Sequence, residues 1–210
     1  MLLVYAIAAG LLVGALSGGR FGSLAGARFR LWPVALAGLF FQLLLFSPPL
    51  AQSVGDAGPL LYVASTGVVL FALLLNLHQP GFVLIALGAL LNFVVIMANG
   101  GQMPASPAAF AAVTGLAAVP VEYFSNSQLI GPQTALPWLG DIFLLPRPLP
   151  LANVFSIGDV LIGLGGAWFI VGVMRRPVAS VGLDGQGTGR PADAGGAASP
   201  AASLAASQHG

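Results

Sequence analysis

The sequence predicts an all-α, polytopic integral membrane protein with about five transmembrane helices, and three observations lead to this fold class. Hydrophobic residues make up 57% of the 210 residues and charged residues only 6%, with a mean hydropathy of +0.94. A soluble domain usually contains about 25% charged residues. The apolar residues gather in five stretches, and the arginines fall almost entirely on one side of the topology that five spans impose. Lipid is therefore the expected solvent.

Each apolar stretch approaches the roughly 20 residues that a membrane helix needs, about 17 to 25 being usual. The five predicted spans are residues 1–17, 31–46, 60–77, 82–98 and 154–174. The first span could instead be a cleaved signal peptide, but no basic residue precedes its apolar run, so we expect it to be retained as a helix. A glycine at every fourth residue (Gly10, Gly14, Gly18) makes one of its faces a packing surface, for another helix of the chain or for a second copy.

Positive charge predicts the orientation. Arg20, Arg28 and Arg30 lie between the first two spans, and Arg175 and Arg176 follow the fifth. An even number of crossings separates these two groups, so they share one side, and the positive-inside rule makes that side cytoplasmic. We therefore expect a multi-pass protein of the bacterial cytoplasmic (plasma) membrane with its N-terminus outside and its C-terminus in the cytoplasm.

The chain divides into a membrane domain, residues 1–176, and a tail, residues 177–210. The tail is rich in Gly, Ala, Ser and Pro, a composition that predicts a disordered cytoplasmic segment. The absence of cysteine excludes disulfides and thiolate sites, and the two histidines are too far apart to suggest a metal site. No Walker or Rossmann glycine loop implies a cofactor, and the net charge of +1 argues against nucleic acid as a partner.

The long connection of residues 99–153 faces outward in this topology. Ser106-Pro107 predicts the capped start of a short helix that continues to Ala118. The prolines at 146, 148 and 150 predict an extended segment. Only Glu122, Asp141 and Arg147 are charged here, so we expect this apolar loop to pack against the membrane domain.

Three motifs in or after this loop resemble the signatures of a bacterial membrane-protein family catalogued as domain of unknown function 5317. They are NGGQMP at residues 99–104, LGDIFLLP at 139–146 and VFSIGDVLI at 154–162. The resemblance covers roughly residues 1–174. It implies that these outward segments belong together, and it brings no activity with it.

Helix geometry adds a second set of residues. At a rise of 1.5 Å per residue, five polar side chains lie about 6 to 9 Å inside the outer ends of four different spans. They are Gln42, Ser65, Thr66, Asn92 and Asp159. An ionisable residue within a span is costly unless it is paired, so this layer is a candidate site.

The candidate ligand-binding residues are Asn99, Gly100, Gly101, Asp141, Ser156, Asp159, Gln42 and Asn92. All of them except Asp141 also have a structural interpretation here. Ser156 and Asp159 have the spacing of a capping box at the start of the fifth span. The asparagine and two glycines can form a helix C-cap rather than an anion-binding nest. Gln42 and Asn92 can serve as hydrogen-bonding residues between helices.

Two hypotheses follow for function. The first is a non-enzymatic binding, sensing or partner subunit with an outward-facing polar pocket, whose partners are the lipid bilayer and a membrane protein or lipid ligand. The second is an intramembrane aspartyl hydrolase that uses Asp141 and Asp159 as a catalytic pair, since two carboxylates that share a proton can activate water. The segment from Asp141 to Asp159 is faintly similar to the last part of lipoprotein signal peptidase. However, Ser156-Ile157-Gly158 stands where that family has Asn-x-Ala.

Overall fold

The structure is a computed structural model that describes residues 2–115 and 126–176. Over these residues the protein is mostly helical, as predicted. The predicted tail, Glu122 and the last residues of the helix expected up to Ala118 lie outside the described residues.

All five apolar stretches form helices close to the predicted bounds. These helices are α1 (Leu2–Leu16), α2 (Trp32–Leu45), α4 (Gly58–Leu74), α5 (Phe82–Ala98) and α7 (Ile157–Met174). Two helical segments, Pro49–Leu74 and Ile157–Met174, are long and apolar enough to cross a membrane. The other three apolar helices, α1, α2 and α5, contain 14 to 17 residues.

The connections contain short elements that the sequence did not predict. The helical ones are η1 (Phe21–Gly26), α3 (Pro48–Val54), η2 (Gly55–Ala57) and η3 (Pro137–Leu139). The strands are β1 (Met103–Ala105), β2 (Ser127–Leu129), β3 (Phe143–Leu145) and β4 (Asn153–Phe155). β1 pairs with β2 in parallel and β3 pairs with β4 antiparallel. The all-α prediction is therefore wrong for the loop of residues 99–153, where short strands supply backbone hydrogen bonds.

The predicted helix within the loop is confirmed at its start and shorter at its end. α6 (Pro107–Thr114) begins after Ser106, whose hydroxyl oxygen accepts a hydrogen bond from the Ala109 amide. It ends at Gly115, whose φ of +75° is a left-handed conformation that favours glycine. The extended segment predicted around the three prolines is wrong: residues 147–151 form turns that join β3 to β4.

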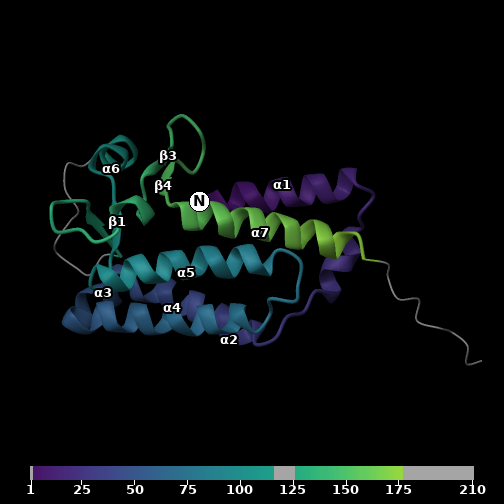
Figure 1. Ribbon diagram of the computed structural model, residues 1–210, viewed down its shortest axis with the longest axis horizontal. Helices are drawn as coiled ribbons and strands as arrows, with labels where there is room; N and C mark the ends of the chain where they lie inside the picture. The colour runs from purple at the N-terminus through teal and green to yellow at the C-terminus, as the bar shows by residue number, and fades with distance from the viewer. Residues whose placement is uncertain (1, 116–125, 177–210) are drawn as a thin grey trace, which may run out of the picture. The chain divides into compact units, whose positions relative to one another are not determined.

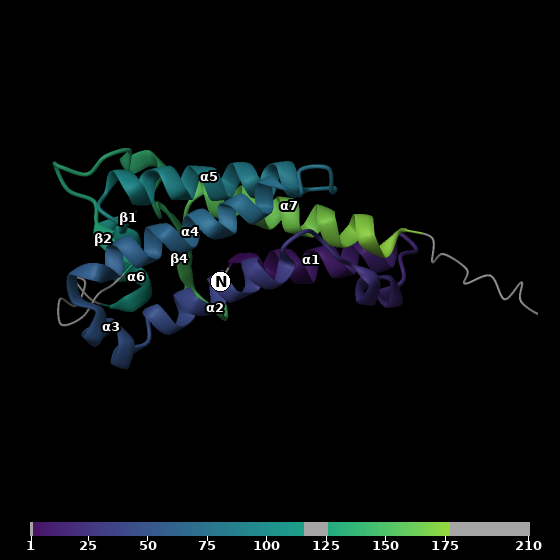
Figure 2. The same cartoon turned by 90° about the horizontal axis from the view of Figure 1, so that it is seen from below.

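Four helix pairs build the bundle in the order α1–α7–α5–α4–α2 (Figure 1). Helices α1 and α2 stand at the two ends of this series and share no substantial contact. Figure 2 shows both of them on the side of the bundle away from α5. The series is thus open between its first and last members.

Glycine allows the backbones of α1 and α7 to approach closely. A β-carbon at Gly10 would lie 2.9 Å from the Cα of Ala167, and one at Gly14 would overlap the side chain of Met174. Gly18, in contrast, has no neighbour within 4 Å of its missing β-carbon. The face predicted for packing is therefore used within the chain at its first two glycines.

The contact between α5 and α7 is also built on glycine. A β-carbon at Gly158 would meet the carbonyl oxygen of Gly88 at 2.7 Å and would overlap the Asn92 side chain. Gly81 and Gly165 meet in the same way at the other end of the contact. Small residues at a helix contact let the two backbones approach closely.

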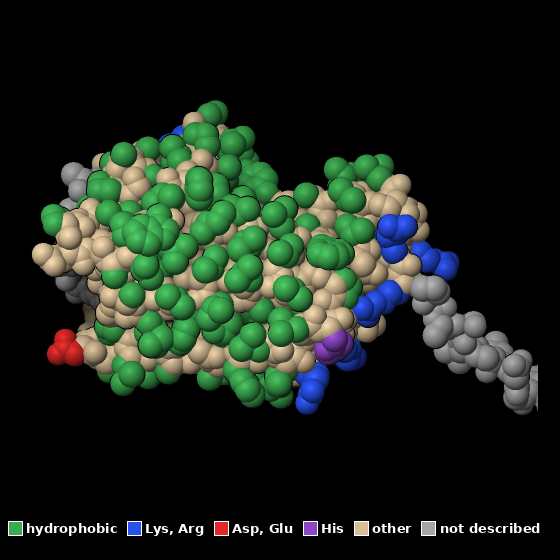
Figure 3. All heavy atoms as spheres, viewed as in Figure 1, with side chains coloured by type: hydrophobic (Ala, Val, Ile, Leu, Met, Phe, Trp, Pro, Cys, Tyr) green, Lys and Arg blue, Asp and Glu red, His purple; other side chains and the backbone are tan. Residues whose placement is uncertain are grey.

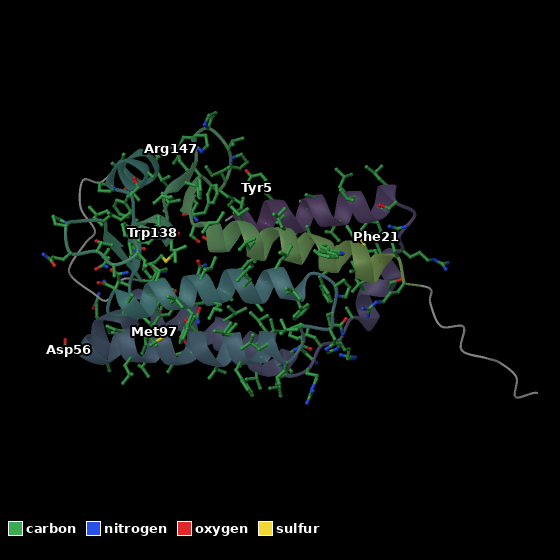
Figure 4. All side chains as sticks on the ribbon, in the orientation of Figure 1. Tyr5, Phe21, Asp56, Met97, Trp138 and Arg147 are labelled. Atoms are coloured by element: carbon green, nitrogen blue, oxygen red, sulfur yellow. The ribbon has the colours of Figure 1, made fainter. Side chains whose placement is uncertain are left out.

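Charge separates the two ends of the bundle. Arginine side chains gather at the end where α1 and α7 finish, and apolar side chains cover the helices (Figure 3). Asp56 lies at the opposite end (Figure 4). Two contacts link segments at the arginine end: the Arg20 amide donates to the Met174 carbonyl, and the Arg176 guanidinium donates to the Gln79 side chain. The long loop lies at the Asp56 end.

The loop packs on the helices, as expected from its apolar composition. Met103 joins a buried cluster with Leu45, Tyr62, Val95 and Ile96, which come from α2, α4 and α5. Tyr62 is only 8% exposed and packs edge-to-face on Phe46, so this cluster is closed off from the surface.

Two contacts hold the β3–β4 connection. The Tyr5 hydroxyl donates to the Pro150 carbonyl, and the Arg147 guanidinium donates to the Val113 carbonyl. Figure 4 shows Tyr5 beneath this connection and Arg147 close to α6. The loop is thereby attached to both α1 and α6.

Candidate functional site

The helices of the bundle enclose a cavity of about 430 Å³. All five apolar helices contribute to its walls, together with β4 and the segment before α2. Most of the wall is aliphatic, with residues such as Leu39, Val69, Ala89 and Ile162. Cavities of about 300 to 1,000 Å³ with a few polar groups are typical of small-molecule sites.

Six polar side chains interrupt the apolar wall. They are Gln42, Tyr62, Thr66, Asn92, Asn153 and Asp159. Four of these, Gln42, Thr66, Asn92 and Asp159, belong to the layer predicted from depth along the spans. Ser65 contacts the layer through its hydrogen bond with Gln42. The helices therefore bring the predicted layer together around one space.

Asn92, Ser156 and Asp159 form one closed hydrogen-bonded group. The Asn92 amide donates to Asp159 Oδ1 at 2.9 Å, and the Ser156 hydroxyl donates to Asn92 Oδ1 at 2.9 Å. Ser156 and Asp159 also form the predicted capping box: the Asp159 amide donates to Ser156 Oγ and the Ser156 amide donates to Asp159 Oδ2, both at 3.0 Å. Ser156 is fully buried. Asp159 therefore caps α7 and ties it to α5 while it lines the cavity.

Gln42 connects α2 to α4 on the opposite wall. Its amide nitrogen donates to Ser65 Oγ and Thr66 Oγ1, both at 3.2 Å. Both hydroxyl groups donate in turn to the Tyr62 carbonyl. In the described part of the chain nothing donates to the Gln42 side-chain oxygen, which leaves an acceptor at the cavity wall.

Two lining residues were not singled out from the sequence. Asn153 was taken as the last residue of the loop, yet β4 places it on the cavity, and its side chain has no hydrogen bond within residues 2–115 and 126–176. Tyr62 is buried and also lines the cavity. For Asn153, the only signal in the sequence was its position directly before the VFSIGDVLI motif.

Asn99, Gly100 and Gly101 do not line this cavity; they form the C-terminal cap of α5. The Gly101 amide donates to the Ile96 carbonyl and the Gly100 amide to the Met97 carbonyl, with positive φ at both glycines. This is the Schellman pattern. The Asn99 side chain clamps the loop, because it both donates to and accepts from the backbone of Ala135 at 2.9 Å. These amides are thus used internally, which supports the capping interpretation.

Asp141 sits in the loop layer above the helices. Its amide donates to the Pro104 carbonyl and its carbonyl accepts from the Ser106 amide, so both backbone groups join β1 to the segment before β3. Burial, and secondly the charge of Asp159, raise the pKa of the Asp141 carboxyl to about 7. The carboxyl side chain has no hydrogen-bond donor among the described residues. Asp141 and Asp159 are therefore close enough to interact electrostatically.

The chemistry available at this site is hydrogen bonding and charge–dipole interaction. Within residues 2–115 and 126–176 no three histidine or carboxylate side chains lie close enough to hold a metal ion. Both oxygens of Asp159 already accept hydrogen bonds. Asn153 and Gln42 retain unused capacity at the wall, so the arrangement suits recognition of a polar group on a largely apolar molecule.

A family model described as a family of unknown function (DUF5317) matches residues 27–171. This range contains α2, α4 and α5, all of α7 except its last three residues, the whole loop and all three motifs. No curated protein and no solved structure matches the chain.

Proposed function

The chain belongs to DUF5317, a family of unknown function, and we propose that it is a non-enzymatic integral membrane protein that binds an amphipathic ligand in the cavity of its helix bundle. The main observation in support is a cavity of about 430 Å³ whose apolar wall is interrupted by one group of polar side chains. Apolar walls supply affinity, and a few placed polar groups supply orientation and selectivity.

The proposal places all five apolar helices in the membrane, with the loop of residues 99–153 outside. Supporting it, only 28% of an apolar 18-residue stretch in each of the two longer spanning candidates is buried within the protein. A core helix of a soluble protein would be mostly buried. Large side chains such as Leu12, Leu43, Leu60 and Trp168 are more than half exposed, and lipid is the solvent that suits such a surface.

Cysteine labelling tests this topology, because the chain has no native cysteine. The two single-cysteine variants are Gln133→Cys in the loop and His78→Cys at the arginine end; both positions are exposed. In intact cells, a membrane-impermeant maleimide should label the first variant and reach the second only after lysis. Labelling of His78→Cys alone in intact cells would show that the protein has the opposite orientation. Labelling of both variants in intact cells would contradict the proposed number of membrane crossings.

Cavity filling tests the binding function. Ala89→Phe adds a ring to the cavity wall, whereas Leu90→Phe, one residue later, changes a position that is 42% exposed and does not line the cavity. Native mass spectrometry of the purified protein should detect a bound small molecule in the wild type and in the Leu90→Phe control, and none in Ala89→Phe. Equal occupancy of all three proteins, or none in the wild type, would refute the proposal.

One observation supports the alternative, an intramembrane aspartyl hydrolase. Asp141 has a raised pKa, and the nearby Asp159 contributes to the shift, as expected when two carboxylates share a site. We rank it second because both Asp159 oxygens are engaged by Asn92 and by the helix cap. A quenched fluorescent peptide with a single membrane span should be cut by the wild type and not by Asp141→Asn if this alternative holds. Equal cleavage by both proteins, or none by either, excludes it.

A further inference from the structure

We infer that the ligand is an acyl-chain amphiphile whose head carries hydroxyl or amide groups and no negative charge, and that it enters from the bilayer between α1 and α2. This inference rests on the proposed function, and it adds the chemical class of the ligand and its route. Three observations lead to it: where the cavity is open, what its polar wall leaves unpaired, and which charges surround it.

The opening lies where the series of helices is not closed. The cavity wall includes Leu2 and Leu3 from α1 and Leu36 and Leu39 from α2, yet these two helices share no substantial contact. Leu3, Leu36 and Leu39 are each between 46% and 53% exposed. An apolar gap between two helices in a membrane faces acyl chains, so a lipid tail can pass through it without leaving hydrocarbon.

The unpaired polar groups of the cavity wall indicate the chemistry of the ligand's head group. Asn153 has a side-chain amide with no partner among the described residues, which offers two donors and an acceptor. The oxygen of Gln42 offers a second acceptor on the facing wall, since the hydrogen bonds of this side chain are donated by its nitrogen. Hydroxyl or amide groups match this mixed set because they both donate and accept.

The surrounding charges argue against an anionic head. Asp159 lines the cavity and Asp141 interacts with it electrostatically. The described arginines are remote from Asp159: apart from Arg147, which is engaged with the Val113 carbonyl, they gather at the opposite end of the bundle (Figure 3). The chain has no lysine. A phosphate or carboxylate head would therefore meet negative charge with no arginine or lysine side chain of the described residues to pair with, a penalty of at least about tenfold in affinity at the dielectric of a partly buried site.

Two probes with the same acyl chain distinguish an uncharged head group from an anionic one. 1-Oleoylglycerol has an uncharged hydroxyl head, and oleoyl lysophosphatidic acid has the same chain with a phosphate. Titrated into the delipidated protein in a non-ionic detergent and followed by native mass spectrometry, 1-oleoylglycerol should bind at least about tenfold more tightly. Equal binding, or a preference for the phosphate, would overturn the inference.

Asn153 supplies matched variants, because no described hydrogen bond depends on its side chain. Asn153→Leu should weaken 1-oleoylglycerol about tenfold, the typical effect of removing a recognised polar contact. Asn153→Lys should raise the affinity for the phosphate probe and so reduce or reverse the selectivity. No change in either variant would remove Asn153 from the site and contradict the assignment of the head. The thermal midpoint of each variant, measured without ligand, separates a binding defect from a folding defect.

The route has its own test in Leu36→Trp, which enlarges a side chain at the gap between α1 and α2. This variant should slow both the uptake and the release of 1-oleoylglycerol by nanodisc-embedded protein at least about fivefold, because an obstruction on the path raises the barrier in both directions. Leu87→Trp on the outer face of α5 is the control. An unchanged exchange rate would refute lateral entry.

Failure of this inference differs from failure of the proposed function. If the cavity-filling variant Ala89→Phe displaces a copurified lipid with an anionic head, binding in the cavity stands and the ligand class is wrong. If the wild type holds nothing and binds neither probe, both proposals are wrong.

Discussion

The contact between α5 and α7 and the contact between α2 and α4 lie on opposite walls of the same cavity and are built differently. The first brings two backbones together at Gly88 and Gly158 and leaves no room for a β-carbon. The second keeps the helices linked by Gln42, whose long side chain reaches the hydroxyls of Ser65 and Thr66. One wall is therefore fixed by backbone shape, and the other by adjustable polar side chains.

This difference assigns the two walls different tasks. The α5–α7 wall carries the closed Asn92–Ser156–Asp159 group, in which each hydrogen bond restrains the others. The α2–α4 wall, with its unused acceptor on Gln42, can adapt to a ligand. Changes on the first wall should therefore cost stability, and changes on the second should cost mainly binding.

The largest effect is expected for Gly158→Ala. The new methyl group would overlap the Asn92 side chain and lie 2.7 Å from the Gly88 carbonyl oxygen, so α5 and α7 would have to separate. Overpacking typically costs about 1 to 3 kcal/mol, and we expect the upper end, about 3 kcal/mol, because backbone has to move. Thermal unfolding in detergent, followed by tryptophan fluorescence, should show a lowered midpoint.

Gly166→Ala is the matched control on the same helix. The nearest atom to its new methyl group would be a leucine methyl 3.9 Å away, and alanine favours the helix, so this variant should be neutral or slightly stabilised. Equal destabilisation by the two alanines would show that the α5–α7 contact is not as close as described.

A second effect, about 2 to 3 kcal/mol, is expected for Asn92→Leu. The change leaves the fully buried Ser156 hydroxyl without an acceptor and removes the donor to Asp159 Oδ1. Leaving buried polar groups unpaired costs about 1 to 3 kcal/mol for each group. The midpoint of thermal unfolding in detergent measures this loss of stability.

A double-mutant cycle with Ser156→Ala sharpens this test. Because the two side chains share a hydrogen bond, the double variant should lose clearly less stability than the sum of the single variants. Strict additivity would mean that Asn92 and Ser156 act independently and that the closed group is not a unit.

The helices of both walls could be predicted from the sequence, because long apolar runs and their proline, glycine and arginine boundaries are local signals. The capping box could be predicted for the same reason, since Ser156 and Asp159 are only three residues apart. The polar layer also followed from local information, because depth along a helix depends only on residue number.

Other features depend on contacts between distant residues. β1 pairs with β2 from residues 24 positions away, and strands of three residues carry no readable alternation. The packing order α1–α7–α5–α4–α2 leaves the gap at the first and last helices, and nothing local in α1 or α2 indicates it. Asn153 was missed because its exposure to the cavity depends on how β4 lies against the bundle.

A third effect concerns pH and the loop above the two walls. The pKa of Asp141 rises from 3.8 to about 7 in the folded protein, so the folded state holds this proton more tightly than the unfolded chain does. Stability should fall as pH rises from about 4 to about 7 and should change little beyond those limits. Three pKa units correspond to about 4 kcal/mol, and partial exposure of the side chain reduces this to about 2 kcal/mol.

The measurement is the unfolding midpoint at pH 5 and at pH 8. The wild type should be the more stable at pH 5, and Asp141→Asn should lose most of this difference. Asp56→Asn, at the exposed end of the bundle, is the control and should retain it. A wild-type midpoint that does not depend on pH would show that the Asp141 carboxyl is solvated.

The smallest change in stability is expected for Gln42→Leu on the adjustable wall. Its two hydrogen bonds are long, at 3.2 Å, and both acceptor hydroxyls keep their own bonds to the Tyr62 carbonyl, so no buried group is left unpaired. Hydrogen bonds between membrane helices contribute about 0.6 kcal/mol on average, so the loss should stay below about 1 kcal/mol. Affinity for 1-oleoylglycerol should nevertheless fall several-fold, because the variant removes an acceptor from the cavity. A large loss of stability with unchanged binding would invert the roles of the two walls, since Gln42 would then hold the bundle together and the polar group that recognises a ligand would have to lie elsewhere.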